Sequence, residues 1–510
     1  MALARRAGVV FLCVFAYLGW LAASRFVLDL NDEGIYLEGG LRLLHGQIPY
    51  KDFFVLTGPG TFVLEAASFR VLGATLAAGR IPVVWDVAIL TACLFWLVSK
   101  LCASSNSIVA GLTACTFLAF VTLGDTAVMA NHRWDSSAWA VLATTLIVAV
   151  TENRSARFSP WISFVAGIAA GISAWCTPTV ALAAVALGVC LVLYRATRRL
   201  FAFYAGGVAV MFAAGAWWIT SIGALPAMLD SLLWGASHYS GANRIWYGAV
   251  TGGYANLLRG TSPDQAVTTI LLLVFLTLPA TLPFFSSIWL WKRPSMSVSV
   301  LLAAGYAMIL STYPRWDLGH LTLVSAPFYA LTASLIAQFS FPGAPALRKT
   351  VALIALVAVG SCLTVSIQNR LREETSASRV GNVHGKPADL EILASIQARV
   401  GRSDTLFVFP YRPLLYFVTG ANNPTRYNFL VPGMFSDKEP EILDDLQAHP
   451  PRWIFYTHVP PEAYSRIWPG LDPRRLQFPD IEAFLRDNYQ ETAQWADFQL
   501  LEAGTSHASR

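Results

Sequence analysis

Three acids stand where the first long apolar segment of the chain ends. Asp29, Asp32 and Glu33 lie in the stretch LDLNDEGIYLEGG. A carboxylate fixed at a membrane surface can remove a proton from an acceptor hydroxyl while a lipid-linked substrate lies alongside. Asp32 is therefore a candidate general base, and Glu33 would either orient it or bind a metal. The alternative is structural, because negative side chains are favoured at a helix start, where Asn31 or Asp32 would be the cap.

The residues after the acids predict a helix followed by a loop. Leu37, Leu41 and Leu44 share one stripe at helical spacing, which suits a helix lying in the membrane interface. The chain then runs through GQIPYKDFFVLTGPG, whose proline and glycine residues are typical of a loop. In this loop Lys51 would pair either with a substrate phosphate or with its neighbour Asp52.

Three later loops hold further ionisable residues. They are His132, Arg133 and Asp135 in MANHRWDSS, His238 and Arg244 in SHYSGANRIWYGAV, and Arg315, Asp317 and His320 in YPRWDLGH. An aspartate cannot reach far from a span end to find water, so Asp135 beside a histidine and an arginine favours an active-site wall. The forked donors of arginine match a phosphate, and Arg315 is the first candidate for this role. Alternatively, Arg315 and Asp317 pair only with each other.

The C-terminal part of the chain adds a mixture of aromatic and cationic residues. The stretch PYRPLLYFVTGANNPTRYNFLVPGM contains Tyr411, Arg412, Tyr416, Arg426 and Tyr427. Such side chains either cover a sugar or a lipid phosphate, or dock this part of the chain onto the membrane part.

The composition defines the elements that must position these residues. Of the 510 residues, 55% are hydrophobic and only 13% are charged, and the mean hydropathy is +0.51, whereas a soluble domain is about one quarter charged. The chain is therefore predicted to be a polytopic α-helical membrane protein. Its net charge of +5 gives little support to a nucleic-acid partner. The seven cysteines all lie in apolar segments without metal-type spacing, so they are predicted to be buried apolar residues.

About eleven segments are long and apolar enough to be transmembrane helices. Their approximate centres are Tyr17, Leu90, Thr116, Thr144, Ala169, Ala186, Val210, Leu273, Ala304, Ala330 and Ala358. The stretch WCTPTV around Pro178 predicts either a kink within one long element or a tight turn between two.

Basic residues mark every second connection between these segments. Starting from Arg5 and Arg6, they are Lys100, Arg154, Arg157, Arg195, Arg198, Arg199, Lys292, Arg293, Arg348 and Lys349. Lysine and arginine close to span ends are retained on the cytoplasmic side of a membrane. The pattern therefore predicts a cytoplasmic N-terminus, with the acids near Asp32 and the last part of the chain on the external side.

Two regions follow from this pattern. Residues 1–368 are predicted to form the transmembrane domain, whose extracytoplasmic first loop spans residues 29–79. Residues 369–510 are predicted to form an extracytoplasmic domain. In this second region short apolar runs such as TLFVF and RWIFY alternate with helical patterns such as EPEILDDLQAHP and IEAFLRDNY. This order predicts a small α/β domain with a short sheet.

Several of these stretches together resemble one family. NDEGIY followed by LLHGQIPYKDFF resembles the GT-C superfamily of integral-membrane glycosyltransferases, in particular bacterial relatives of protein O-mannosyltransferases and of the aminoarabinose transferase that acts on lipid A. HRWDSSAWAVLA looks like the second acidic site of those enzymes. YPRWDLGHL and FPYRPLLYFVTGANNPTRYNFLVPG resemble segments of other bacterial members, so the resemblance covers most of the chain.

The resemblance implies an enzyme of a bacterial-type plasma membrane that moves a sugar from a polyprenyl-phosphate donor at the external face, with inversion at the anomeric carbon. It implies Asp32 as the catalytic acid-base residue, Glu33 as its partner and Asp135 as the second-loop acid. In one place the chain departs from the pattern. It has VLTGPG where the aminoarabinose transferases have a Glu-Lys-Pro-Pro run, so Lys51, Arg133 or Arg315 would have to hold the donor phosphate. A divalent metal ion as cofactor is left open.

We therefore predict a GT-C-like glycosyltransferase whose acceptor is an unidentified glycan, lipid or protein. The rival prediction is a transporter or flippase of a lipid-linked sugar, in which ionisable residues would mark a pathway through the middle of the bilayer. Here the ionisable residues gather at span ends and in loops, with Asp86 as the main exception, and this favours chemistry at a surface. A membrane scaffold without catalysis is the third possibility.

Overall fold

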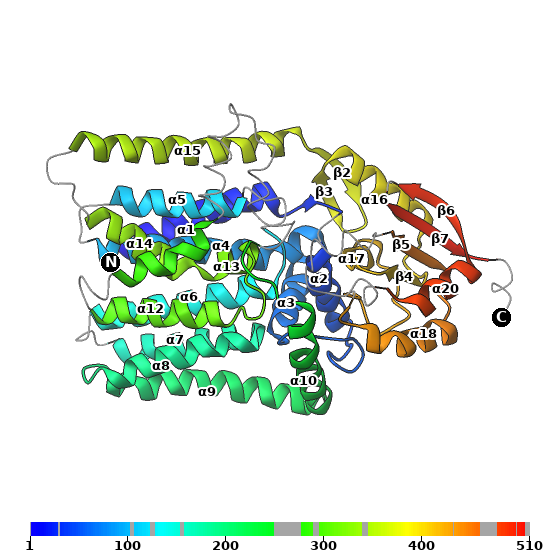
Figure 1. The fold of residues 1–510 in the computed structure, drawn as a ribbon, viewed down its shortest axis with the longest axis horizontal. Helices are drawn as coiled ribbons and strands as arrows, with labels where there is room; N and C mark the ends of the chain where they lie inside the picture. The colour runs from blue at the N-terminus through cyan, green and yellow to red at the C-terminus, as the bar shows by residue number, and fades with distance from the viewer. Residues whose placement is uncertain are drawn as a thin grey trace.

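A helical bundle at one end of the molecule and a mixed region of strands and helices at the other make up the computed structural model (Figure 1). The structure describes residues 2–28, 31–102, 107–122, 128–152, 158–248, 277–288, 295–338, 345–431, 433–458, 477–495 and 497–504. The N-terminus lies in the bundle and the C-terminus at the far end of the strands (Figure 1).

Five helices among the described residues are long and apolar enough to cross a membrane. They are α1 (Ala2–Ala22), α4 (Leu76–Leu101), α6 (His132–Glu152), α7 (Ser159–Cys176) and α9 (Arg198–Ser221). Shorter apolar helices accompany them, namely α5 (Ser107–Thr122), α8 (Ala181–Leu193) and α12 (Met296–Leu310). The chain is thus a helical membrane protein.

The remaining helices of the bundle are bent or lie at its edges. α13 (Leu318–Val324) and α14 (Ala326–Gln338) are bent by 71° relative to each other, and α15 (Pro345–Arg372) runs along the outside of the bundle (Figure 1). Every expected span centre lies in a helix except Leu273, which falls outside the described residues.

Pro178 marks a turn between two helices and not a kink within one. α7 ends at Cys176, a single 3-10 turn spans Pro178–Val180, and α8 begins at Ala181. A residue that precedes proline is disfavoured in helical geometry, and this explains why Thr177 is extended. Of the two alternatives left by the sequence, a kink or a turn, the structure shows the turn, which joins two separate helices.

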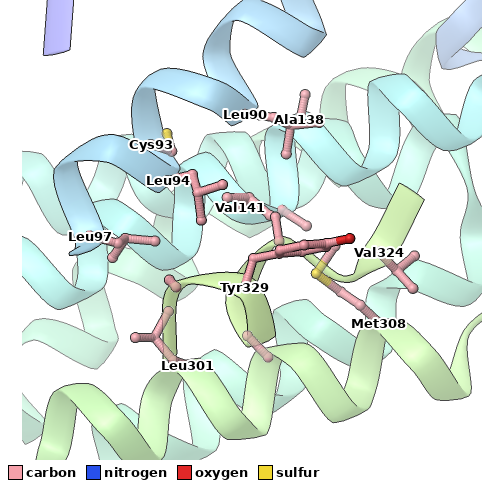
Figure 2. Close-up of a cluster of buried hydrophobic side chains, with 14 of the residues drawn as sticks. Leu90, Cys93, Leu94, Leu97, Ala138, Val141, Leu301, Met308, Val324 and Tyr329 are labelled. Atoms are coloured by element: carbon pink, nitrogen blue, oxygen red, sulfur yellow. The ribbon is translucent and has the colours of Figure 1, made fainter. Parts of the chain in front are cut away.

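The centre of the bundle is a cluster of closely packed apolar side chains. Figure 2 shows Leu90, Leu94 and Leu97 of α4 facing side chains from α6, α12 and the α13–α14 pair. In a membrane, packing of complementary helix surfaces holds a bundle together, because lipid is as apolar as the side chains. Since α4 and α6 are central, polar residues on them are carried into the interior.

The first loop folds into two helices that lie between the bundle and the strand-containing region (Figure 1). α2 (Asn31–Leu44) contains the acids and packs against α3 (Gly60–Leu72) on one side. A further helix, α10 (Leu225–Ala242), follows α9 across the turn at Gly223, where φ is +66°. Residues 277–288 are also helical.

The C-terminal region, residues 373–504 as described here, is built on two small sheets. The larger has the strand order β4-β5-β7-β6, in which β4 is parallel to β5 and the other pairs are antiparallel. Its elements are β4 (Leu406–Phe409), α17 (Leu414–Thr419), α18 (Glu439–Ala448), β5 (Trp453–Thr457), α20 (Pro479–Asn488), β6 (Tyr489–Trp495) and β7 (Phe498–Ala503). These small sheets with their helices agree with the alternating pattern of the sequence.

The smaller sheet joins this region to the start of the chain. β3 (Gly381–Gly385) lies between antiparallel β2 (Glu374–Ser378) and parallel β1 (Arg25–Phe26), the two residues that follow α1; α16 (Pro387–Arg399) comes next in the chain. Glu373 accepts hydrogen bonds from Arg25 and, at 2.7 Å, from His384. The segment just before the acids is therefore fixed to the C-terminal region.

Candidate active site

Asp32, in the first turn of α2, contacts a residue from the other end of the chain. The Tyr411 hydroxyl donates a hydrogen bond to Oδ1 of Asp32. Burial, and then the negative charge of Asp32, raise the pKa of Tyr411 well above that of a free phenol. The phenol therefore keeps its proton and acts as a donor. This contact of Asp32 is not a helix cap, because its partner is a side chain of the C-terminal region.

Glu33, one residue further, points into the protein. Its Oε1 and Oε2 accept hydrogen bonds of 2.6 Å from Nε and Nη2 of Arg80, and Oε1 also accepts from the amide of Ala130. Arg80 in turn donates to the carbonyl oxygens of Ala22 and Arg25. The Glu33 and Arg80 side chains are 0% and 1% exposed. Both oxygens of Glu33 are thus bonded to groups other than Asp32.

Around Asp32, polar, aromatic and charged residues from five segments of the chain form one polar cluster. Tyr36, one turn after Asp32 on α2, lies with its ring 5.6 Å from the ring of His132 on α6. Tyr239 of α10 is within electrostatic reach of Asp32 and of Arg133. Burial raises the pKa of Tyr36 and of Tyr239, so both hydroxyls stay protonated. We call Asp32, Tyr36, His132, Arg133, Tyr239, Arg315, Asp317, His320 and Tyr411 the polar cluster.

Arg133 is a buried cation in this cluster with unused donor capacity. Its Nη1 donates to the carbonyl of Ser311 at 3.1 Å, whereas its buried Nε donates to none of the residues that the structure describes. Asp317, Tyr36 and Tyr239 are its electrostatic neighbours. A buried guanidinium without a bonded carboxylate is costly unless an anion joins it, so Arg133 is well suited to bind one.

Arg315 is held by an ion pair, as the structural alternative from the sequence proposed. Nε of Arg315 lies 2.6 Å from Oδ2 of Asp317, and Nη1 donates to Asn243. His320 donates its backbone amide to Oδ1 of Asp317, and its Nδ1 lies 2.8 Å from the same oxygen. Although burial opposes it, contact with His320 and Arg315 holds the pKa of Asp317 well below its usual value. Arg315 therefore brings less net positive charge than Arg133.

Asp135 lies deeper than Asp32 and belongs to a second group of acids. Its Oδ2 accepts a hydrogen bond of 2.5 Å from Thr61 of α3, and Asp86 of α4 is its close neighbour. Glu65 of α3 completes the group; burial and the charge of Asp135 raise the pKa of Glu65 well above its usual value. Asp135 is also an electrostatic neighbour of Tyr36 in the polar cluster.

Two of the expected phosphate ligands are exposed and lie outside the polar cluster. Lys51 forms no ion pair with Asp52 or with any other acid in the described part of the chain, and its Nζ lies near Gly223 at the turn before α10. Arg244 is also exposed. Neither residue has a described contact with Asp32.

Two further candidates, His238 and Arg426, connect parts of the protein, whereas the described contact of Arg412 lies within the C-terminal region. His238 stacks on Trp234 and lies 3.6 Å from Asp437 of the C-terminal region. Arg426 donates to the carbonyl of Tyr50 at 2.7 Å, and Arg412 packs over the ring of Phe498. For Arg426 the docking alternative is therefore the one that matches the contacts.

Three residues that contact the acids or belong to the polar cluster were not predicted from the sequence. Tyr36 lies four residues after Asp32, and this spacing places both on one face of a helix. Tyr239 is adjacent to His238, and α10 turns Tyr239 and not His238 towards the cluster. Arg80 lies in the apolar run LAAGRIPVV, where a charged residue signals a buried partner. The spacing and the apolar context of these residues can be seen in the sequence, but the side chains that they contact cannot be identified from it.

The carboxylates near the polar cluster are a poor fit for a metal ion. Asp32 accepts from Tyr411, Glu33 from Arg80, and Asp317 from Arg315 and His320. In the described part of the chain no three histidine, cysteine or acidic side chains are grouped so that they could hold a metal.

The arrangement of helices is shared with solved structures of low sequence identity, and this likeness agrees with the resemblance noted in the sequence at the level of the fold. The chain is similar to ArnT from Cupriavidus metallidurans in the apo state, with a TM-score of 0.61 and 13% identity, covering 98% of both chains. The same protein bound to undecaprenyl phosphate gives a TM-score of 0.57 and 12% identity, covering 98% of this chain and 99% of that one.

A second similar structure is the Archaeoglobus fulgidus oligosaccharyltransferase in complex with Zn and sulfate. It gives a TM-score of 0.50 and 12% identity, with 88% of this chain and 68% of that chain covered. No protein-family profile matches the chain, and no curated protein sequence matches it.

Proposed function

We propose that this protein is a membrane glycosyltransferase that moves a sugar from a polyprenyl-phosphate donor to an acceptor hydroxyl, with Asp32 as the general base. The observation that carries the proposal is the polar cluster itself. It sets a carboxylate, Asp32, near a buried guanidinium with an unpartnered nitrogen, Arg133. The fold supports it, since the ArnT structure of the same fold is one with bound undecaprenyl phosphate.

The reaction is a single displacement. The acceptor oxygen forms a bond to the anomeric carbon on the face opposite the phosphate, the bond between that carbon and the phosphate oxygen breaks, and the configuration inverts. The acceptor proton passes to Asp32. The polyprenyl phosphate leaves as an anion, so it needs charge neutralisation more than it needs an acid.

Arg133 takes the role of first phosphate ligand, ahead of Arg315. Arg133 has a buried Nε without a hydrogen bond to a described residue, whereas Nε and Nη1 of Arg315 are bonded to Asp317 and Asn243. Both guanidiniums are electrostatic neighbours of Tyr239. Arg315 then binds a second oxygen of the phosphate through Nη2, its remaining nitrogen. Its net positive charge is lower than that of Arg133 because it is paired with Asp317.

The polar cluster faces the outside of a bacterial-type plasma membrane in this proposal. Basic residues at alternate connections support a cytoplasmic N-terminus, and they leave the C-terminal region on the external side. A lipid-linked donor in the outer leaflet would then reach Asp32 from the bilayer, and an acceptor glycan, lipid or protein would reach it from the external side.

Sugar transfer by the purified protein in liposomes tests the proposal. Radiolabelled polyprenyl-phosphate hexoses and pentoses are offered together with an extract of cell-envelope acceptors, and label in the acceptor fraction is counted. The Asp32→Asn variant serves as the matched control. We expect one donor to be used by the parent and not by the variant. Equal use by both would remove Asp32 from catalysis, and movement of intact donor across the bilayer without transfer would favour a flippase.

A further inference from the structure

Tyr411 is the residue of the C-terminal region that reaches Asp32. It follows β4 directly in the chain, after Phe409 and Pro410, and its hydroxyl donates to Oδ1 of Asp32. Its ring lies 6.1 Å from the ring of Phe429 at a steep angle, within the aromatic core of that region. The side chain therefore has a fixed position relative to the C-terminal region and not to the bundle.

Several contacts fix the C-terminal region to α2, the helix that holds Asp32. Gly34 packs so closely on α17 that a Cβ atom there would lie 1.9 Å from the backbone nitrogen of Leu414. One turn further on α2, Glu38 accepts a hydrogen bond of 2.6 Å from Asn428. The first loop adds a backbone bond of 2.9 Å from Phe54 to Arg426. The distance between Tyr411 and Asp32 is thus determined by a whole interface.

We propose, on the basis of the function proposed above, that Tyr411 is a positioning residue through which the C-terminal region completes the active site. By occupying Oδ1, the phenol leaves Oδ2 of Asp32 for the acceptor hydroxyl and fixes the plane of the carboxylate. The acceptor proton then moves to Oδ2, while Tyr411 keeps its own proton throughout. A base held in one orientation is more effective than a freely rotating one, because reaction needs an aligned approach.

The protonated state of Tyr411 supports this role. Burial and the charge of Asp32 raise its pKa, so the phenol does not compete as a base at neutral pH. The other charged or titratable groups facing Asp32 are Tyr36, Tyr239 and Arg315. Tyr411 alone among the described residues donates a side-chain hydrogen bond to the Asp32 carboxylate.

The test is the Tyr411→Phe variant of the full-length protein in the transfer assay. We expect kcat to fall about 10- to 100-fold, as for a small misplacement of a reacting group, with KM changed by less than about threefold. Thermal unfolding of the purified variant shows that it is folded.

Tyr427→Phe is the matched control. Tyr427 lies in the same region and donates to the Glu441 carboxylate at 2.9 Å, outside the polar cluster, so we expect removal of its hydroxyl to leave kcat unchanged. A Tyr411→Phe variant with parental kcat would overturn the proposal. A rise in KM at unchanged kcat would also overturn it, since it would make Tyr411 a substrate ligand.

A double variant separates this role from the proposed function. If Tyr411 acts through Asp32, the loss caused by Tyr411→Phe disappears in an Asp32→Asn background; additive losses contradict it. If the parent protein transfers sugar and Asp32→Asn does so equally well, the proposed base fails, and this role of Tyr411 fails with it.

Discussion

The two faces of α2 place adjacent acids in opposite surroundings. Asp32 lies in a cluster of tyrosines and arginines, and its described partner is a neutral phenol. Glu33 is fully buried against the Arg80 guanidinium, with two hydrogen bonds of 2.6 Å. A carboxylate bonded to a neutral donor keeps its charge available, whereas one paired with a buried cation has its charge neutralised. This contrast is the reason why we propose chemistry for Asp32 and expect Glu33 to contribute to stability.

The same contrast separates the cations. Arg80 has carboxylate and carbonyl partners for all three of its nitrogens, while Nε of Arg133 is buried without a described acceptor. Natural proteins tolerate an unsatisfied buried donor at few places, and functional sites are among them. An enzyme gains from such a group when its substrate supplies the missing anion.

The largest expected effect is on catalysis at Asp32. Asp32→Asn keeps the shape of the side chain and its acceptor for Tyr411 but removes the base, so we expect kcat to fall about 100- to 10,000-fold. The thermal unfolding midpoint should stay close to that of the parent. Transfer of label under saturating donor, together with unfolding of the purified protein, measures both. A loss of stability as large as that of Glu33→Gln would erase the distinction between the two acids.

Glu33→Gln is expected to lower stability and to leave catalysis largely unchanged, which is the opposite of Asp32→Asn. Removal of one partner from a buried ion pair leaves the other charge uncompensated and costs about 3–5 kcal/mol. We expect a clearly lower unfolding midpoint, and residual folded protein with near-parental kcat. The Glu33→Leu/Arg80→Met double variant removes both charges and should recover most of the midpoint. Parental stability of Glu33→Gln would show that the pair with Arg80 does not form.

Gly34→Ala tests the interface between α2 and the C-terminal region. The added Cβ would meet backbone atoms of α17, which cannot rotate away, and overpacking of this kind costs about 1–3 kcal/mol. We expect increased protease cleavage between the bundle and the C-terminal region, with lower kcat because Tyr411 shifts. The control is Gly19→Ala in α1, where nothing lies within 4 Å of the new Cβ. Equal behaviour of the two variants would contradict the close packing.

The smallest effect in this series is on donor binding. Arg133→Gln removes the buried guanidinium, and since a hydrogen bond to a charged group is worth about 1.5–3 kcal/mol, we expect donor KM to rise about 10- to 100-fold. Lys51→Gln, which removes a positive charge at an exposed position, is the control and should change KM by less than about threefold. Kinetics at varied donor concentration compare them. A larger rise of donor KM for Lys51→Gln than for Arg133→Gln would place the phosphate site in the first loop.

The bundle was largely predictable from sequence, because a transmembrane helix depends on a run of apolar residues and needs no knowledge of its neighbours. The helix at Asp32 followed from local preferences in the same way, whereas the sequence left a kink and a turn equally open at Pro178. β1 was not predictable: it has two residues, Arg25 and Phe26, and exists because β3 pairs with it from across the chain. Isolated short strands have no stability of their own.

The site was predictable in part. His132, Arg133, Arg315 and His320 were singled out by type, and the fold brings them into the polar cluster, with Arg315 as an electrostatic neighbour of Asp32. Lys51 and Arg244 were chosen by the same criterion, yet they are exposed and apart from it. The sequence does not indicate where the side chain of a charged loop residue points, because a loop is positioned by the elements that it connects.

By itself the sequence determined that this is a helical membrane protein with acids at the end of its first apolar helix, since both properties are additive along the chain. Only the tertiary structure decided which neighbours each of the two acids contacts. Successive residues of a helix point about 100° apart, so Asp32 and Glu33 necessarily face different neighbours. Those neighbours, Tyr411 and Arg80, come from distant parts of the chain, and packing alone brings them to the two faces of α2.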